Sequence, residues 1–167
     1  MNSKQDLINI SFICQGNICR SPYAEKRAKA IFSKYKDTFS FKSAGMLPRN
    51  PRRSPSEAIS AAAARNVQLS DHLSRHADEN FVDSTDLFFV FDTKNYRHFR
   101  DRYPERLGDV YILTDAVTTN KVFNVIDDPD GLGIGAFQKS YSEIDQILEE
   151  FLNALESGSQ YSSSPKR

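Results

Sequence analysis

Four apolar stretches of the chain are typical of strands. They cover residues 8–13, 39–44, 86–91 and 110–113. The stretch at 86–91 reads Asp-Leu-Phe-Phe-Val-Phe and is almost continuously apolar, as expected for an interior strand of a parallel sheet. The first stretch also has the character of a buried strand, so this pattern predicts a sheet at the centre of the molecule.

Apolar residues at helical spacing predict two helices in the first half of the chain. The first runs from Pro22 to about residue 36, with Ser21 as its N-cap and proline at its first position, where a missing N–H costs nothing. The second is rich in alanine and opens with Ser54-Pro55-Ser56-Glu57, which has the form of a capping box. It runs through about residue 65, and Asn66 is its expected left-handed stop.

The second half of the chain predicts two more helices, separated by a long irregular stretch from about residue 114 to 135. Asp92 is the expected cap of a helix that stops before Pro104. The last helix carries apolar residues between Tyr141 and Leu155 and ends near Gly158. The Gly-Leu-Gly-Ile-Gly run at 131–135 follows no strand and lacks the end of a phosphate loop, so we expect a hinge there.

Alternation of strands and helices predicts an α/β sheet with right-handed crossovers. In such sheets, ligands bind outside the carboxyl ends of the strands, where the strand order reverses. A chain of 167 residues is long enough for one domain and too short for two comfortable ones. We therefore expect a single domain over residues 1–158, followed by a disordered, serine-rich tail over residues 159–167.

The composition argues against several classes of protein. Twenty-two basic residues balance twenty-two acidic ones, so no overall charge favours nucleic acid or a membrane as a partner. Two cysteines separated by four residues do not form a secreted disulfide framework, and three dispersed histidines do not indicate a metal site. With no signal-peptide pattern and no run of membrane-spanning length, a cytoplasmic protein is expected.

The first predicted strand ends at Cys14, and a loop of five residues leads from it to Arg20 and the first helix. Loop N–H groups and a helix N-terminus together bind anions, and Gly16 allows the backbone to approach such a ligand closely. Arg20 adds a planar fork that can hold two oxygens of a phosphate group. The same field favours the thiolate form of a cysteine, which is the nucleophilic form. The alternative is that Cys14 and Cys19 are only small buried hydrophobic residues.

The run Cys14-Gln15-Gly16-Asn17-Ile18-Cys19-Arg20-Ser21-Pro22 resembles the signature of the low-molecular-weight protein tyrosine phosphatases, and the resemblance covers about residues 7–155. It implies a three-layer fold in which four parallel strands, ordered 2-1-3-4, have helices on both faces. It also implies that Cys14 is the nucleophile, that Arg20 and the loop residues Gln15, Gly16, Asn17, Ile18 and Cys19 bind phosphate, and that no metal or cofactor is needed. Asn17, Ser21, Ser43 and His72 match positions that support this loop in the family.

Attack on phosphorus also requires a proton donor for the departing oxygen. The stretch Asp127-Asp128-Pro129-Asp130-Gly131 resembles the acid loop of the family, and its Asp-Pro pair maps the general acid to Asp128. Repulsion among three neighbouring carboxylates would help one of them to keep a proton. The alternative is that Asp-Pro and Asp-Gly simply make turns.

The chain departs from the family pattern at the walls of the expected pocket. The family usually has aromatic residues just after Asp-Pro and in the loop after the second strand, where this chain has Asp130 and Gly131, and Met46 to Pro48. Selectivity for phosphotyrosine is therefore open. The arginines at 49, 52 and 53 either lie on a solvated loop or contact an acidic substrate.

These observations predict a phosphomonoesterase, most simply a protein tyrosine phosphatase that works through a cysteinyl-phosphate, with a phosphorylated protein or a small phosphoester as its partner. Alternatives are a phosphatase of the same fold that acts on phosphoarginine or a small phosphoester, and a non-catalytic phosphate-binding module. The arginine phosphatases typically have threonine where this chain has Ile18. An arsenate reductase would need further cysteines after Cys19, and the sequence has none.

Cys19 has two interpretations: a packing residue, or a thiol that captures oxidised Cys14 as a reversible disulfide. His76 and His98 match no position of the family pattern and are expected to be ordinary surface residues.

Overall fold

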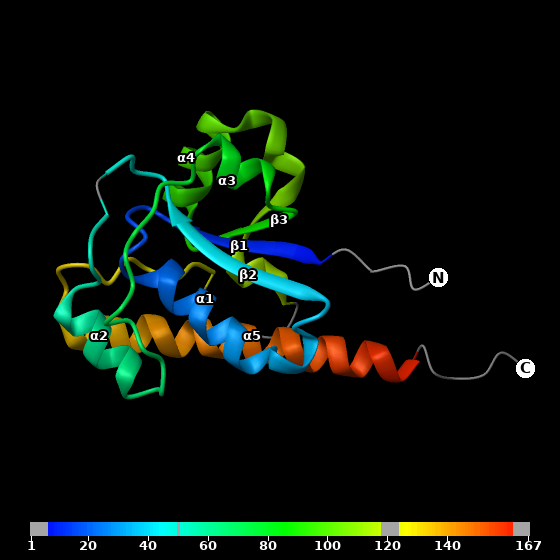
Figure 1. Ribbon diagram of the computed structural model, residues 1–167. Helices are drawn as coiled ribbons and strands as arrows, with labels where there is room; N and C mark the ends of the chain where they lie inside the picture. The colour runs from blue at the N-terminus through cyan, green and yellow to red at the C-terminus, as the bar shows by residue number, and fades with distance from the viewer. Residues whose placement is uncertain (1–6, 50, 118–123, 162–167) are drawn as a thin grey trace, which may run out of the picture.

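The structure is a computed structural model, and it describes residues 7–49, 51–117 and 124–161. Its centre is a parallel sheet of four strands in the order β2-β1-β3-β4, which confirms the predicted order (Figure 1). The strands are β1 (Ile8–Cys14), β2 (Phe39–Gly45), β3 (Leu87–Val90) and β4 (Val110–Ile112).

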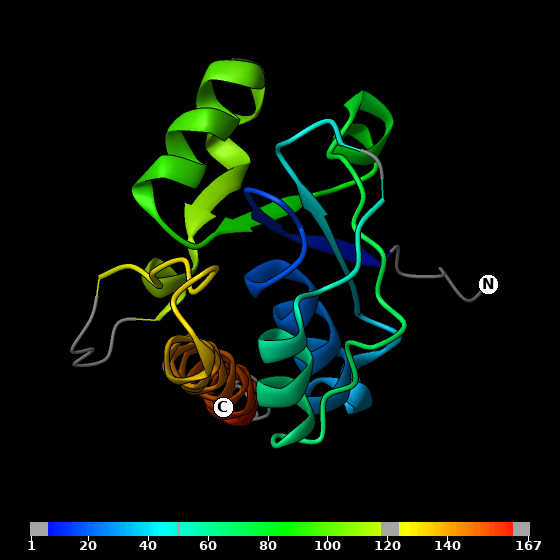
Figure 2. The same ribbon diagram turned by 90° about the vertical axis from the view of Figure 1, so that its left-hand side faces the viewer.

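Helices cover both faces of the sheet, so the molecule has three layers (Figure 2). One face carries α1 (Arg20–Ile31), α2 (Ser56–Ala63) and α5 (Ile134–Tyr161), and the other carries α3 (Glu79–Asp83) and α4 (Thr93–Arg102). The three-layer α/β fold expected from the sequence is therefore confirmed.

Two hydrophobic cores lie between these layers, one on each face of the sheet. Successive side chains of a strand point alternately into one core and into the other. In β1, Phe12 faces the core under α1 and α5, whereas the next residue, Ile13, faces the core under α3 and α4. In β3, Phe89 and Phe88 divide in the same way. Since successive side chains of a strand point to opposite faces, continuous apolar runs are what a sheet covered on both sides requires.

The first helix begins earlier and ends earlier than predicted. Cys19 is its N-cap and Arg20 its first residue, so Pro22 lies within the first turn, where N–H groups have no intrahelical partner. The predicted cap at Ser21 is wrong. The α-helix ends at Ile31, and a short 3₁₀ turn, η1 (Ser33–Tyr35), occupies most of the remaining predicted length.

The predicted capping box at the start of the second helix is also wrong. Pro55 is the N-cap of α2, no side chain caps the helix, and Ser54 Oγ is buried without a hydrogen-bond partner among the described residues. The reciprocal bond is missing because Glu57 accepts instead from its neighbour Ser56, at 2.9 Å. The predicted left-handed stop is confirmed, with Asn66 at a φ of 58°.

Several short elements after α2 were not predicted, because their apolar residues are too few to show a period. They are α3, which Asp78 caps by accepting from Phe81 N, and the 3₁₀ turns η2 (Pro104–Asp109) and η3 (Leu113–Ala116). The cap of α4 is confirmed: Asp92 accepts a hydrogen bond from Asn95 N at 2.7 Å.

The last helix is longer than predicted at both ends. It begins at Ile134 and continues to Tyr161, so the first three residues of the tail expected to be disordered are helical. The rest of that tail, residues 162–167, and residues 118–123 of the irregular stretch lie outside the described residues. In the described ranges, no helix is long and apolar enough to cross a membrane.

Candidate active site

The loop between β1 and α1 surrounds the sulfur of Cys14 with hydrogen-bond donors. The Cys14 side chain is 3% exposed, and its Sγ accepts from Asn17 N at 3.3 Å. Ser21 Oγ lies 3.0 Å from the same sulfur. Asn17 Nδ2 donates to Ser21 Oγ at 2.9 Å, which leaves the hydroxyl hydrogen of Ser21 to the sulfur or to the Ala44 carbonyl, 3.5 Å away. Hydrogen-bonding groups of Asn17 and Ser21 thus converge on the Cys14 sulfur.

Asn17 holds this loop in shape from its centre. Its φ of 54° is a left-handed conformation that few residues other than glycine adopt. Its buried side chain donates to Ser21 and to Ser43 Oγ, at 2.9 and 3.0 Å, and accepts from Arg75 N at 2.9 Å. One amide therefore ties the loop to β2 and to the segment before α3. Together these bonds engage both polar atoms of the Asn17 side chain, Nδ2 and Oδ1.

His72 supports the same loop from outside. Its Nε2 lies 2.7 Å from the main-chain oxygen of Asn17, and because a carbonyl can only accept, Nε2 carries the proton. Burial lowers the pKa of His72, so its neutral form is favoured at physiological pH. Ser43, the other predicted support, donates to Glu25 Oε2 at 2.6 Å. Ser21, Ser43 and His72 thus all lie around Asn17.

Arg20 is buried and held by acidic and carbonyl groups. Only 1% of the residue is exposed, and its Nη1 donates to Asp92 Oδ2 at 2.5 Å and to the Ile126 carbonyl at 2.7 Å. Burial by itself would lower the pKa of Arg20, but nearby Cys14, Asp128 and Asp92 together outweigh it and raise that pKa. The guanidinium therefore stays charged. Its Nε is buried with no partner among the described residues, so one N–H remains for a ligand.

Asp128 lies beside this guanidinium, with its Oδ2 at 3.2 Å from Arg20 Nη2. A hydrogen bond from Ile126 N to the carbonyl of Phe91, at 2.8 Å, attaches the loop to the end of β3. The Asp127 carboxylate, in contrast, is largely exposed and pairs with Lys139, at 3.8 Å. Of these two adjacent aspartates, only Asp128 is positioned to act together with the loop of Cys14.

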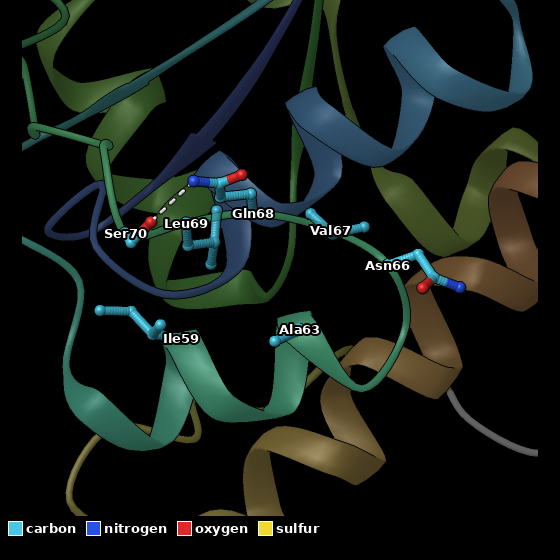
Figure 3. A pocket seen from close by; sticks show the side chains of 7 residues that line it. All are labelled: Ile59, Ala63, Asn66, Val67, Gln68, Leu69 and Ser70. Atoms are coloured by element: carbon cyan, nitrogen blue, oxygen red, sulfur yellow. Dashed lines mark hydrogen bonds between the residues drawn. The ribbon is translucent and has the colours of Figure 1, made fainter.

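A cavity of about 120 Å³ opens over the loop. Its lining combines the nucleophile candidate, the acid candidate and two of the arginines that the sequence analysis left open: Cys14, Gln15, Gly16, Ile18, Cys19, Leu47, Arg49, Arg52, Asp128 and Asp130. Among the described residues, no aromatic side chain lines this cavity. A larger cavity of about 470 Å³ lies between α2 and residues 66–70, and no charged side chain lines it (Figure 3).

Comparisons with known proteins agree with this geometry. A family model described as low molecular weight phosphotyrosine protein phosphatase matches residues 9–161. The chain belongs to this family. Its curated relatives include a protein-arginine-phosphatase of Bacillus subtilis, 24% identical over 89% of this phosphatase and 97% of the relative. Another is the low molecular weight phosphotyrosine protein phosphatase of Schizosaccharomyces pombe, 26% identical over 89% and 97%.

Solved structures give the same result. The protein tyrosine phosphatase of Entamoeba histolytica, with Hepes in its active site, is 28% identical and has a TM-score of 0.79. That match covers 91% of this phosphatase and 99% of the other chain. The fold of the phosphatase and its membership of a hydrolase family are thereby established.

Sequence reasoning missed several residues of this phosphatase site. Asp92 was expected only to cap α4, but its second carboxylate oxygen also holds Arg20. His98 was expected on the surface, but it is half-buried. Its Nδ1 lies 3.3 Å from Oε1 of Gln15, a residue of the predicted phosphate-binding loop (residues 14–20, hereafter the phosphate loop). His76 was expected on the surface too, but it is half-buried and its Nδ1 lies 3.2 Å from the carbonyl of Gly45. Both surface expectations were wrong.

Gly45 is a further residue that only the structure explains. It ends β2 directly opposite Cys14 in the parallel register. A Cβ at this position would lie 2.9 Å from Asn17 N and 2.9 Å from the carbonyl carbon of Gly16. The phosphate loop can therefore pass this close to β2 only because residue 45 has no side chain.

Proposed function

We propose that the chain is a protein tyrosine phosphatase that hydrolyses phosphomonoesters through a cysteinyl-phosphate on Cys14. One observation carries this proposal: Cys14 and Asp128 line the same small cavity, and the buried Arg20 lies against Asp128 with a free N–H. Nucleophile, charge stabiliser and proton donor are the three groups that phosphoryl transfer to a thiolate requires.

In the first step, the Cys14 thiolate attacks phosphorus while the ester oxygen leaves on the opposite side. The loop amides and Arg20 stabilise the charge on the equatorial oxygens. Asp128 protonates the departing oxygen. Gln15, Gly16, Ile18 and Cys19 contribute the loop backbone around the phosphate, and Asn17 holds that backbone in place.

In the second step, Asp128 accepts a proton from water, which attacks the cysteinyl-phosphate and releases inorganic phosphate. Ser21 lies 3.0 Å from Cys14 Sγ and stabilises the thiolate as it leaves. Neither step draws on a metal or a cofactor. The partner expected is a phosphorylated protein or a small phosphoester, and the cytoplasmic location and single domain over residues 1–158 stay predictions.

The test measures hydrolysis of aryl phosphates with good and poor leaving groups. Cys14→Ser should abolish turnover and keep binding of a phosphate mimic, since a hydroxyl is a far weaker nucleophile. Asp128→Asn should slow poor leaving groups by roughly 10²–10⁴ and good ones less. Asp127→Asn is the matched control and should behave like the wild type. If Asp127→Asn shows the leaving-group effect and Asp128→Asn does not, the assignment of the acid is wrong.

Phosphoarginine is a second candidate substrate, because one relative is a protein-arginine-phosphatase and no aromatic residue among the described ones lines the cavity. Against it, Ile18 lines the cavity where such enzymes typically have threonine. Comparing turnover of phosphotyrosine and phosphoarginine peptides decides between the two. A non-catalytic phosphate-binding module would hydrolyse neither.

A redox role for Cys19 also stays a prediction. Both cysteines are free and buried, and burial, followed by the effect of Cys14, raises the pKa of Cys19 far above its usual value. The raised pKa disfavours the Cys19 thiolate, the form that would capture an oxidised Cys14. Wild type inactivated by mild peroxide should recover activity with a thiol reductant, and Cys19→Ser should not. Equal recovery would leave Cys19 as a packing residue.

A further inference from the structure

Two segments that line the active-site cavity carry opposite charges. The loop after β2 contributes Arg49 and Arg52, and the acid loop contributes Asp128 and Asp130. Asp128 is engaged by Arg20 at 3.2 Å. Arg49 and Arg52, in contrast, line the same cavity and have no role in the proposed chemistry.

Arg52 is held against the phosphate loop. Its main chain forms two hydrogen bonds with Ser74: Arg52 N donates to Ser74 Oγ at 2.9 Å, and its carbonyl accepts from Ser74 N at 2.8 Å. Its side chain is half-buried, and its Nη2 lies 3.0 Å from the position that a Cβ of Gly16 would occupy. The guanidinium thus lies beside the residues that would receive the phosphate.

The charge of Arg52 is not neutralised within the described chain. No carboxylate of residues 7–49, 51–117 or 124–161 forms an ion pair with it, and its Nε is buried without a hydrogen-bond partner. Two other arginines of the fold have such partners: Arg65 pairs with Asp145 at 2.7 Å, and Arg53 donates to the Ser70 carbonyl at 2.8 Å. A buried donor without a partner is costly, so its position beside a cavity suits it to a ligand.

We propose that Arg52 is a specificity-determining residue that binds a carboxylate next to the phosphorylated residue of a protein substrate. The proposal rests on the phosphatase function proposed above and deepens it. A guanidinium fork binds a carboxylate through two parallel hydrogen bonds. Because Arg52 Nη2 lies beside Gly16 of the phosphate loop, we place the carboxylate that it binds on a residue adjacent to the phosphotyrosine. Asp130, on the acid loop that lines the same cavity, repels such a side chain. The acidic residue is therefore preferred on only one side of the phosphotyrosine in the peptide, either before it or after it.

The test compares peptides that differ only in Glu or Gln immediately before or after phosphotyrosine. For the wild type, the ratio of kcat/KM, Glu over Gln, should reach about 5 to 10 at one of the two positions, between the values of an exposed ion pair and a charged hydrogen bond. Arg52→Met should reduce this ratio to about 1, and Arg52→Lys should retain part of it. The matched control, Arg53→Gln, should keep the wild-type ratio.

Two results would overturn the proposal: a ratio of 1 in the wild type, or an unchanged ratio in Arg52→Met. If Arg52→Met slows both peptides equally, Arg52 acts on the reactive phosphate and not on a neighbouring carboxylate. Failure of the phosphatase function is recognised separately, as no turnover of p-nitrophenyl phosphate. In that case the same ratio is measured as dissociation constants in the Cys14→Ser background, with and without Arg52→Met, which needs no catalysis.

Discussion

A single residue, Asn17, holds the backbone of the phosphate loop in one conformation through several hydrogen bonds. Asn17 bonds to Ser21, to Ser43 and to the main chain of Arg75 while holding a φ of 54°. A bonded network of this kind fixes the loop before any ligand arrives, so the phosphatase does not have to order it during the reaction.

Asn17→Ala should therefore lower both stability and activity. It removes three hydrogen bonds from a buried network and leaves Arg75 N without its partner, at about 1–3 kcal/mol for an unsatisfied group, and it places alanine in a left-handed conformation. We expect a loss of at least about 3 kcal/mol in the free energy of unfolding and a fall in kcat, measured by chemical denaturation and aryl phosphate turnover.

Asn66→Ala is the matched control, because Asn66 has a φ of 58° but lies after α2, away from the phosphate loop. It should cost about 1 kcal/mol through the same backbone strain, with kcat unchanged. An equal loss of kcat in both variants would mean that Asn17 acts only through global stability.

His72 links stability to pH. Burial lowers its pKa in the folded state, so the unfolded chain binds the proton more readily between the lowered value and about 6.5. This contribution to stability is complete above pH 6.5 and is lost as the pH falls through that window. The free energy of unfolding should fall between pH 7 and 5 more steeply in the wild type than in His72→Gln. Parallel pH profiles would contradict this role.

Among the elements, the ends of β1 and β2 decide where the phosphate loop lies. Cys14 and Gly45 are partners in the parallel register, and the loop passes over Gly45 at contact distance. Arg20 then opens α1, so strand end, loop and helix start follow one another without an intervening residue. This arrangement directs the helix N-terminus and the loop amides toward one point.

Gly45→Ala should disturb this junction. The added Cβ would meet backbone atoms of Gly16 and Asn17 at 2.9 Å, and backbone cannot move aside as a flexible side chain can. Overpacking of this kind typically costs about 1–3 kcal/mol, and we expect kcat to fall with it. Gly108→Ala, where nothing lies within 4 Å, is the control and should change neither quantity. Wild-type kcat in Gly45→Ala would show that the loop tolerates displacement.

For the whole molecule, α5 completes the core on the face that bears α1 and α2. Its first part supplies fully buried residues such as Phe137 and Ile144, and its last turns supply half-buried ones, among them Phe151, whose ring lies 5.5 Å from that of Phe32. Since one helix reaches from the acid loop to the far end of the sheet, stability and the position of Asp128 depend on the same element.

Chains truncated at two positions in α5 test how much its last turns contribute to stability. A chain that stops after Gly158 should keep the thermal midpoint and activity of the full chain, as the predicted domain boundary requires. A chain that stops after Glu150 loses Phe151, Leu152 and Leu155 from the core. At about 1 kcal/mol for each half-buried side chain, we expect a loss of about 3 kcal/mol, measured by thermal unfolding. Equal midpoints for the two truncated chains would contradict this view of α5.

The sequence by itself determined the features whose causes are local. The apolar runs of β1 and β3, the Asp92 cap of α4 and the left-handed Asn66 follow from neighbouring residues, because periodicity and capping act over a few positions. The signature beginning at Cys14 likewise identified the family, since a phosphate loop is a continuous segment. The order of the strands came from that resemblance, because periodicity does not encode which strands pair.

Only the tertiary structure decided which distant residues complete the site. Asp92 meets Arg20 across 72 positions, His98 meets Gln15 across 83, and Arg75 meets Asn17 across 58. Such contacts depend on how the carboxyl ends of parallel strands and the following loops converge, and this information does not lie in any local pattern. For the same reason, the sequence left Arg52 between a solvated loop and a substrate contact, whereas folding placed it against Gly16.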